Sequence, residues 1–301
     1  MYFEGILTPV VVPFNDNFTL NRKALEQIIN LLAKSGVHGI IVAETIGEYY
    51  AMSMKERVYL IGLIKEMLGG RLPMIVGTGA IRTEESIEYA LQAKSHGADA
   101  IVVTTPPYAC PTGHEIALHV LEIDQAVNLP IILHNDPSRM SRNMNKETLV
   151  QLSHLTNCTI QESSGDLSRL HMLARDFPNI ALSCGSNGQA LEFFAWGARS
   201  WVCAASNFAP EAHIAIYKAC VIEGDFNKGR EIMTAMLPLI QALEKNGTII
   251  QSVKYCLKMR GIDAGPPRKP LRPLEKNDKC ILEELVHALI NEISIIEKGN
   301  S

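Results

Sequence analysis

The segment AIVVTTPPYACPTGHEIALHVLEIDQAVNLPIILHNDPSR, residues 100–139, decides the fold. Two almost uninterrupted apolar runs, 100–104 and 131–134, flank an amphipathic stretch, and polar residues follow each run. Strands that are buried on both faces of a parallel sheet have such continuous runs, because neither face meets water. The segment therefore predicts a strand–helix–strand unit with parallel strands.

The same unit repeats on both sides of this segment. Six further apolar runs alternate with helical patterns, of which 20–35 and 83–95 are the clearest. These runs are 6–12, 39–43, 74–77, 159–161, 181–184 and 201–204. Eight parallel strands with helical crossovers predict a (β/α)8 barrel. A doubly wound open sheet is the alternative, but it usually has fewer strands, and no GxGxxG follows the first run.

The C-terminal part of the chain contains helical patterns without strands. They span 212–222, 226–245, 248–259 and 279–297. We therefore expect a barrel over residues 1–225 and a C-terminal helical extension over residues 226–301. We also expect Thr83 to cap the helix that begins there, because TEES places a hydroxyl before acidic residues.

Composition and charge exclude several classes of protein. Apolar residues make up 47% of the chain and charged residues 20%, which excludes a disordered protein. The net charge of −4 predicts no nucleic-acid partner, and the apolar runs are too short to cross a membrane. The first residues carry Glu4 and no basic segment, unlike a secretory signal. Seven widely spaced cysteines favour a reduced, cytoplasmic protein without a disulfide framework.

The candidate functional residues follow the strands, because the carboxyl ends of barrel strands carry the active sites of this fold. The segments at these ends are ETIGE (44–48), TTPPY (104–108), HNDPSR (134–139), QESSGD (161–166), SCGSN (183–187) and AASNF (204–208). Glu44, Asp136, Glu162 and Cys184 add ionisable groups near His134, but their spacing is not that of a metal site. We expect no metal, and we expect Glu162 to make structural hydrogen bonds at the barrel rim.

These segments resemble, in order, the motifs of the dihydrodipicolinate synthase and N-acetylneuraminate lyase family. ETIGE corresponds to the family's GTTGE, and YACP at 108–111 to its Y-x-x-P. HNDPSR corresponds to Y-N-x-P-x-R, and QESSGD to K-E-[AS]-[ST]-G-D. Residues 261–274 are similar to the final G-x-x-x-G-P-x-R-x-P-L-x-P-L pattern. The resemblance covers nearly the whole chain.

The resemblance implies a class I aldolase or dehydratase that needs no cofactor. Such an enzyme binds pyruvate or another 2-oxo acid, or a sugar acid, as a Schiff base on a strand-six lysine. It further implies a homotetramer built as a dimer of dimers, in which the tyrosine at 108 reaches the neighbouring subunit. The site residues implied are Gln161, His134, Thr45 and Tyr108 at catalytic positions and Ile46, Arg139, Gly185 and Val202 at substrate-binding positions.

The sequence departs from the family pattern at decisive positions. Gln161 replaces the Schiff-base lysine, and a carboxamide nitrogen is not nucleophilic because its lone pair is delocalised. His134 replaces the proton-shuttling tyrosine, and imidazole titrates near neutral pH whereas phenol titrates near about 10. Ile46 and Glu44 replace a threonine and a glycine of GTTGE. We therefore predict that iminium chemistry is absent.

Several interpretations stay open at this point. Gln161 either binds a ligand or fills a vacated space, and His134 is either a general acid–base or a core histidine. Arg139 either anchors an acidic substrate or fixes its loop through a salt bridge. The protein is then an enzyme with altered, non-covalent lyase chemistry, or a non-catalytic ligand-binding or regulatory relative. An ordinary aldolase that uses another lysine is the third hypothesis, and no lysine ends a strand to support it.

Overall fold

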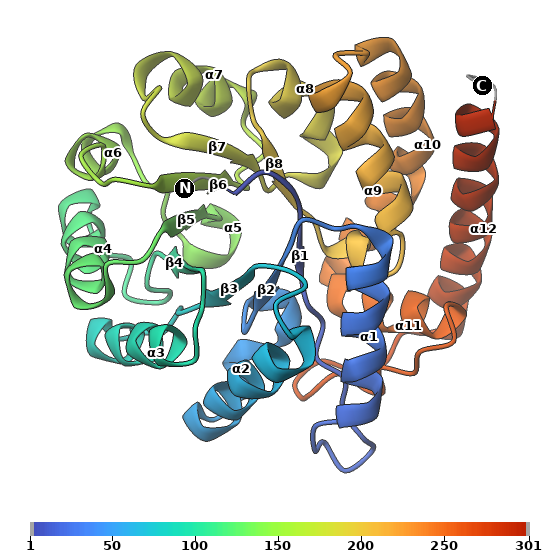
Figure 1. Ribbon diagram of the computed structural model, residues 1–301, viewed down its shortest axis with the longest axis horizontal. Helices are drawn as coiled ribbons and strands as arrows, with labels where there is room; N and C mark the ends of the chain where they lie inside the picture. The colour runs from blue at the N-terminus through green and yellow to red at the C-terminus, as the bar shows by residue number, and fades with distance from the viewer. Residues whose placement is uncertain (1–2, 299–301) are drawn as a thin grey trace.

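Eight parallel strands close into a barrel in the computed structural model, which describes residues 3–298 (Figure 1). The strands are β1 (Gly5–Pro9), β2 (Gly39–Val42), β3 (Met74–Gly77), β4 (Ala100–Thr104), β5 (Ile131–Asn135), β6 (Cys158–Glu162), β7 (Ala181–Cys184) and β8 (Ser200–Val202). Because β1 pairs with β8, the sheet has no open edge. The predicted (β/α)8 barrel is confirmed, and the open-sheet alternative is wrong.

Helices surround the barrel and connect successive strands (Figure 1). They are α1 (Arg22–Ser35), α2 (Met54–Leu68), α3 (Thr83–Ser95), α4 (Gly113–Val127), α5 (Pro137–Met140), α6 (Lys146–Leu152), α7 (Leu167–Asp176), α8 (Ala190–Ala195) and α9 (Pro210–Tyr217). The predicted cap at Thr83 is wrong. Arg82 precedes the helix as the cap residue, and the Thr83 hydroxyl instead lies 3.0 Å from His119 Nδ1.

The apolar core has two layers, one between the strands and the helices and one inside the barrel. The inner layer comprises Phe3, Leu7, Ile41, Ile75, Ala100, Val102, Ile132 and Val202. Burying an aliphatic side chain of this kind contributes about 1.5–3 kcal/mol. These side chains fill the barrel below the ends of the strands, so the barrel is closed and a ligand is confined to the mouth.

The register of the sheet places polar side chains of neighbouring strands at one level. Thr104 of β4 pairs with His134 of β5, and His134 pairs with Gln161 of β6. Residues in register on parallel strands point to the same face, and the following residues point to the other. His134 and Gln161 therefore lie side by side, while their neighbours Asn135 and Glu162 face the opposite way.

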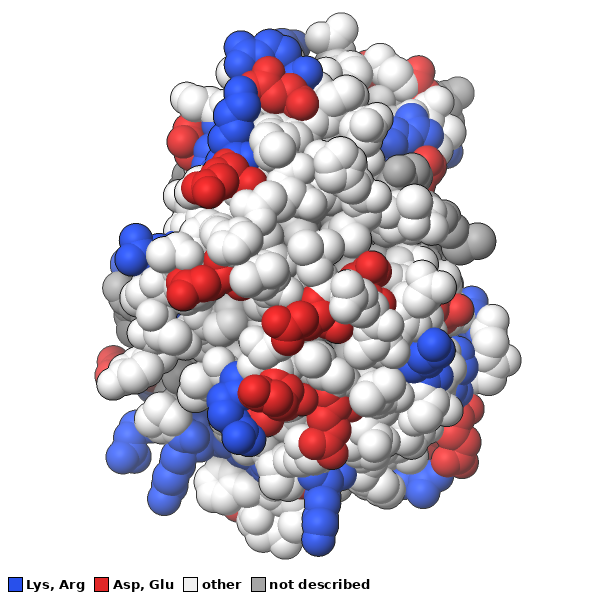
Figure 2. Space-filling view, turned by 90° about the vertical axis from the view of Figure 1, so that its left-hand side faces the viewer, with Lys and Arg blue, Asp and Glu red and all other residues white. Residues whose placement is uncertain are grey.

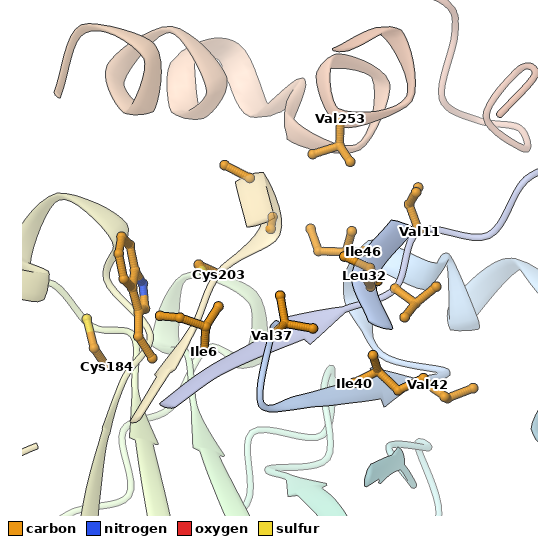
Figure 3. Packing of buried hydrophobic residues seen from close by; sticks show 14 of the residues in the cluster. Ile6, Val11, Leu32, Val37, Ile40, Val42, Ile46, Cys184, Cys203 and Val253 are labelled. Atoms are coloured by element: carbon orange, nitrogen blue, oxygen red, sulfur yellow. The ribbon is translucent and has the colours of Figure 1, made fainter. Parts of the chain in front are cut away.

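The C-terminal part consists of α10 (Phe226–Glu244), α11 (Ile249–Met259) and α12 (Lys276–Lys298). In Figure 1 α12 runs along the outer side of the molecule beside α10 and α11. Val253 of α11 points toward Ile46 and Val11, which follow β2 and β1 (Figure 3). The predicted helical extension is confirmed and packs against the mouth of the barrel. The division of the chain at residue 225 stays a prediction.

On the face shown in Figure 2, acidic side chains lie across the middle and basic side chains lie mostly toward the edges. Within residues 3–298, no helix has the length and apolar character needed to cross a membrane.

Candidate functional site

A cavity of about 440 Å³ opens at the carboxyl ends of the strands. Seven of the eight predicted site residues line it: Gln161, His134, Thr45, Ile46, Arg139, Gly185 and Val202. They follow or end five different strands, so the closure of the barrel brings together residues that lie far apart in the chain. The structure therefore brings these seven residues together around one cavity, and their roles stay a prediction.

Tyr108 is the predicted site residue that does not line this cavity. It lies in the loop between β4 and α4, its side chain is 89% exposed, and its φ is +73°. A positive φ is uncommon for an aromatic residue and indicates that the loop imposes this conformation. Within the single chain described, Tyr108 faces solvent rather than the cavity.

His134 and Glu44 form a buried pair in the lining of the cavity. Nδ1 of His134 lies 3.1 Å from Oε1 of Glu44, and both side chains are less than one tenth exposed. Ala43, which directly follows β2, has a φ of +56°, and this sharp turn brings Glu44 into the cavity. Because Nδ1 is engaged, Nε2 is the nitrogen of His134 that is left for a ligand.

The carboxylate of Glu44 also accepts hydrogen bonds from its neighbour. The backbone N–H of Thr45 donates to Oε2, and the Thr45 hydroxyl donates to Oε1 over 3.2 Å. Burial alone would raise the pKa of Glu44, but the His134 charge and these hydrogen bonds outweigh burial and lower that pKa. Glu44 is therefore held in its ionised form.

His134 has the opposite shift. Burial alone would lower the pKa of His134, but the charge and hydrogen bond of Glu44, assisted by Asp136, outweigh burial and the opposing charge of Arg139. The pKa of His134 therefore lies above its ordinary value of 6.5. This arrangement supplies a charged imidazolium in the pH range where an isolated histidine is losing its proton.

The pair predicts how stability depends on pH. A raised histidine pKa stabilises the fold below 6.5 and loses that contribution as pH rises through the folded-state value. The lowered pKa of Glu44 stabilises the fold above 4.5 and loses its contribution as pH falls. We expect the difference in the free energy of unfolding between wild type and His134→Gln to be largest between pH 4.5 and pH 6.5. The difference should shrink as pH rises further and passes the pKa of His134 in the folded protein. Urea unfolding of both proteins from about pH 5 to pH 9 measures it. A difference that grows with rising pH would contradict the pair.

Gln161 lies beside His134 with its carbonyl oxygen unpaired. The residue is 5% exposed, and Oε1 has no hydrogen-bond partner among the described residues. An unpaired buried acceptor costs about 1–3 kcal/mol, so a ligand donor at this point would be favourable. Gly185 leaves room for this side chain, because a Cβ there would lie 3.0 Å from Gln161 Cγ and 2.0 Å from Ser163 Oγ.

Arg139 lies at the outer part of the cavity. Its Nε is 3.3 Å from Oδ2 of Asp136, which accepts a further hydrogen bond of 2.5 Å from Ser138 on its other oxygen. The Arg139 side chain is 45% exposed, so water screens this ion pair and a ligand can reach the guanidinium. The two interpretations of Arg139 from the sequence are compatible, because the guanidinium can bind an acid group of a ligand while it pairs with Asp136.

Glu162 makes structural contacts, as the sequence predicted. Its carboxylate accepts hydrogen bonds from Arg169, from Asn135 Nδ2 over 2.9 and 3.0 Å, and from the Ser164 N–H. These bonds join β5, β6 and α7 on the side of the strands opposite to His134. Among residues 3–298, no group of three or more histidine, cysteine, aspartate and glutamate side chains is arranged to bind a metal ion.

No lysine is among the described residues that line this cavity. Lys254, which is buried, lies in α11, and its Nζ is 2.6 Å from Oε1 of Glu48 and 3.0 Å from the Pro266 carbonyl oxygen. Lys254 lines a separate cavity beside the C-terminal segment. The lysine that a Schiff base needs is therefore not at the mouth of the barrel in the described part of the chain.

Sequence reasoning missed part of the site. Glu244, Gly247 and Ile249 reach the cavity from the end of α10 and the start of α11, and Gln189 reaches it after β7. No motif marks these positions, because they are placed by the packing of the C-terminal helices. The direct pairing of Glu44 with His134 was also missed, although a glutamate in place of a motif glycine was a signal for it.

Comparisons with known proteins show which family this chain is similar to. The sequence model of the dihydrodipicolinate synthetase family matches residues 2–289. The 4-hydroxy-tetrahydrodipicolinate synthase of Protochlamydia amoebophila is 32% identical over 299 residues, which cover 97% of this chain and 98% of that protein.

Solved structures show the same architecture. The 4-hydroxy-tetrahydrodipicolinate synthase of Methylacidiphilum fumariolicum superposes with a TM-score of 0.92 at 27% identity and covers 98% of each chain. The chloride-inhibited dihydrodipicolinate synthase of Acinetobacter baumannii, solved in complex with pyruvate, superposes with a TM-score of 0.89 at 30% identity, covering 97% of this chain and 99% of that one.

Proposed function

This chain belongs to the dihydrodipicolinate synthetase family, and we propose that it binds a small 2-oxo acid or sugar acid and acts on it by proton transfer through His134. The observation that carries the proposal is the buried His134–Glu44 pair beside Gln161 in the mouth of the barrel. The reaction class is that of a lyase, in which a carbon–carbon or carbon–oxygen bond forms or breaks. The pyruvate complex of the Acinetobacter relative supports a 2-oxo acid.

The proposal replaces covalent catalysis with acid–base catalysis. Gln161 occupies the lysine position of the family motif, and its amide cannot attack a ketone to form an imine. Glu44 holds His134 by Nδ1 and keeps it charged, so Nε2 can donate a proton to a leaving hydroxyl or to a carbanion. Gln161 accepts a hydrogen bond from the ligand through its free Oε1.

The remaining residues position the ligand. The Arg139 guanidinium at the mouth attracts an acid group, while Ile46 and Val202 provide an apolar wall. Tyr108 lies outside the cavity with its side chain in solvent, which supports the proposal that it meets a neighbouring subunit in a homotetramer. The proposal includes a cytoplasmic location and no nucleic-acid or membrane partner.

The experiment is a turnover screen of purified protein with 2-oxo acids and sugar acids at saturating concentration. We expect a substrate whose turnover falls about 10²–10⁴-fold in His134→Gln, because general acid–base catalysis contributes that much. His154→Gln, which changes an exposed histidine, is the matched control and should retain wild-type turnover. Turnover that is equal in wild type and His134→Gln would refute the proposed role of His134.

A second candidate function is ligand binding without catalysis. The specific observation in its favour is Gln161 at the lysine position, together with the lack of a lysine in the described cavity lining. Such a protein would bind a small acid, regulate a partner, or assemble with an active homologue. In the same screen it would show ligand-dependent thermal stabilisation without turnover of any compound.

A further inference from the structure

The buried wall of the cavity contains three hydrogen-bond donors that converge on one carboxylate. They are the Thr45 N–H, the Thr45 hydroxyl and Nδ1 of His134, and all three donate to Glu44. Glu44, Thr45 and His134 are each more than nine tenths buried. Charge-assisted hydrogen bonds of this kind are about twice as strong as neutral ones. Without the Glu44 side chain, the donors would form a site for a small carboxylate.

The surrounding charge opposes a second anion at this point. Glu44, Asp136 and Glu244 contribute three carboxylates to the cavity lining, against His134 and Arg139. A ligand carboxylate placed beside Thr45 would meet Glu44 without free donors, and two neighbouring anions disfavour each other. A ligand acid group therefore has better electrostatic surroundings near Arg139, which is half-exposed and at the outer part of the cavity.

The side chain of Gln161 provides an independent observation, because its oxygen lacks a hydrogen-bond donor among the described residues of the cavity. Oε1 of Gln161 is buried and unpaired, and an amide oxygen only accepts hydrogen bonds. A carboxylate cannot satisfy it, because a carboxylate also only accepts. A hydroxyl or amine group of the ligand can.

We propose that Glu44 is a built-in occupant of an anion subsite, so that the ligand presents a hydroxyl or amine donor to Gln161 and keeps its acid group near Arg139. The orientation of the acid group rests on the proposed function, whereas the occupancy of the subsite by Glu44 does not. Removal of the Glu44 side chain then exposes a site that takes a small monocarboxylate from solution.

Formate is the probe, and the signals of the His134 ring in NMR spectra are the readout. We expect Glu44→Gly to bind formate in a saturable way, at least about tenfold more tightly than wild type, because three donors are freed. Bound formate should also restore the raised pKa of His134. Glu44→Gln fills the same space with a neutral group, and Glu244→Gly removes a carboxylate from the cavity rim, so neither should gain a formate site.

Each outcome decides the proposal. A folded Glu44→Gly that does not bind formate would overturn it, and so would equal formate binding in Glu244→Gly. If Glu44→Gly does not fold, the wild-type protein provides the test. Saturable perturbation of the wild-type His134 signals by formate would show that the subsite is open, and this result would also overturn the proposal. None of these measurements needs turnover, so loss of the proposed function and loss of this inference remain distinguishable.

Discussion

Lys254→Met is expected to lower the free energy of unfolding by about 3–5 kcal/mol, because it leaves a buried carboxylate without its cation. Glu48 has no exposed side-chain surface, and Lys254 is 3% exposed. Burial lowers the pKa of Lys254, and the Glu48 charge opposes that shift. Methionine is unbranched like lysine and only one atom shorter, so packing changes little. Urea unfolding of wild type and variant measures the difference.

The control is in the same helix. Lys258 is one turn further along α11 and pairs with Asp263 over 3.1 Å, but both side chains are more than half exposed. Lys258→Met should therefore cost less than about 1 kcal/mol. Adding Glu48→Gln to Lys254→Met should recover part of the loss, since it removes the unpaired charge. Equal effects of Lys254→Met and Lys258→Met would refute this account of the pair.

This pair explains why a glutamate ends the segment ETIGE although two other positions of that motif, Glu44 and Ile46, have changed. Oε2 of Glu48 accepts the backbone N–H of Arg268 over 2.6 Å, and Arg268 donates to the Ala51 carbonyl oxygen over 2.7 Å. Glu48 thus joins the short helical turns after β2 to the C-terminal segment and to α11. Because Thr45 and Glu44 belong to the same turns, the pair fixes the part of the cavity that holds His134.

The fold could be predicted from the sequence because each strand contains a run of mostly apolar residues. The runs 74–77, 100–104 and 181–184 match their strands residue for residue. Since barrel strands present their carboxyl ends at one mouth, the motif positions at those ends predicted the cavity lining as well. Where a strand is buried on both faces of the sheet, its local sequence was enough to predict it.

What the sequence could not predict depends on contacts between distant segments. Glu44 and His134 are 90 residues apart, and their pairing follows from the turn at Ala43, which no propensity indicates. Glu244 and Ile249 reach the cavity only because α10 and α11 pack against the barrel mouth. Thr83 has a good capping side chain, but His119 of a neighbouring helix provides a tertiary partner for its hydroxyl.

Borohydride reduction in the presence of pyruvate is expected to leave the intact mass of the wild-type protein unchanged. An iminium needs a primary amine at the ketone, and Gln161 provides an amide there while the described cavity lining has no lysine. Loss of a covalent nucleophile costs on the order of 10⁶ in kcat, and no other group in the cavity restores that route. The Protochlamydia relative, treated in the same way, serves as the positive control.

Gln161→Lys is expected to convert this negative result into a stable pyruvate adduct. The new amine would lie at the end of β6, buried beside the charged His134, and both burial and a neighbouring cation lower a lysine pKa and leave the amine free to attack. Gln189→Lys places the same side chain elsewhere in the cavity lining, so it should form far less adduct. An adduct on wild type that maps to a native lysine would show that this chain retains imine chemistry, and the proton-transfer mechanism would then fail.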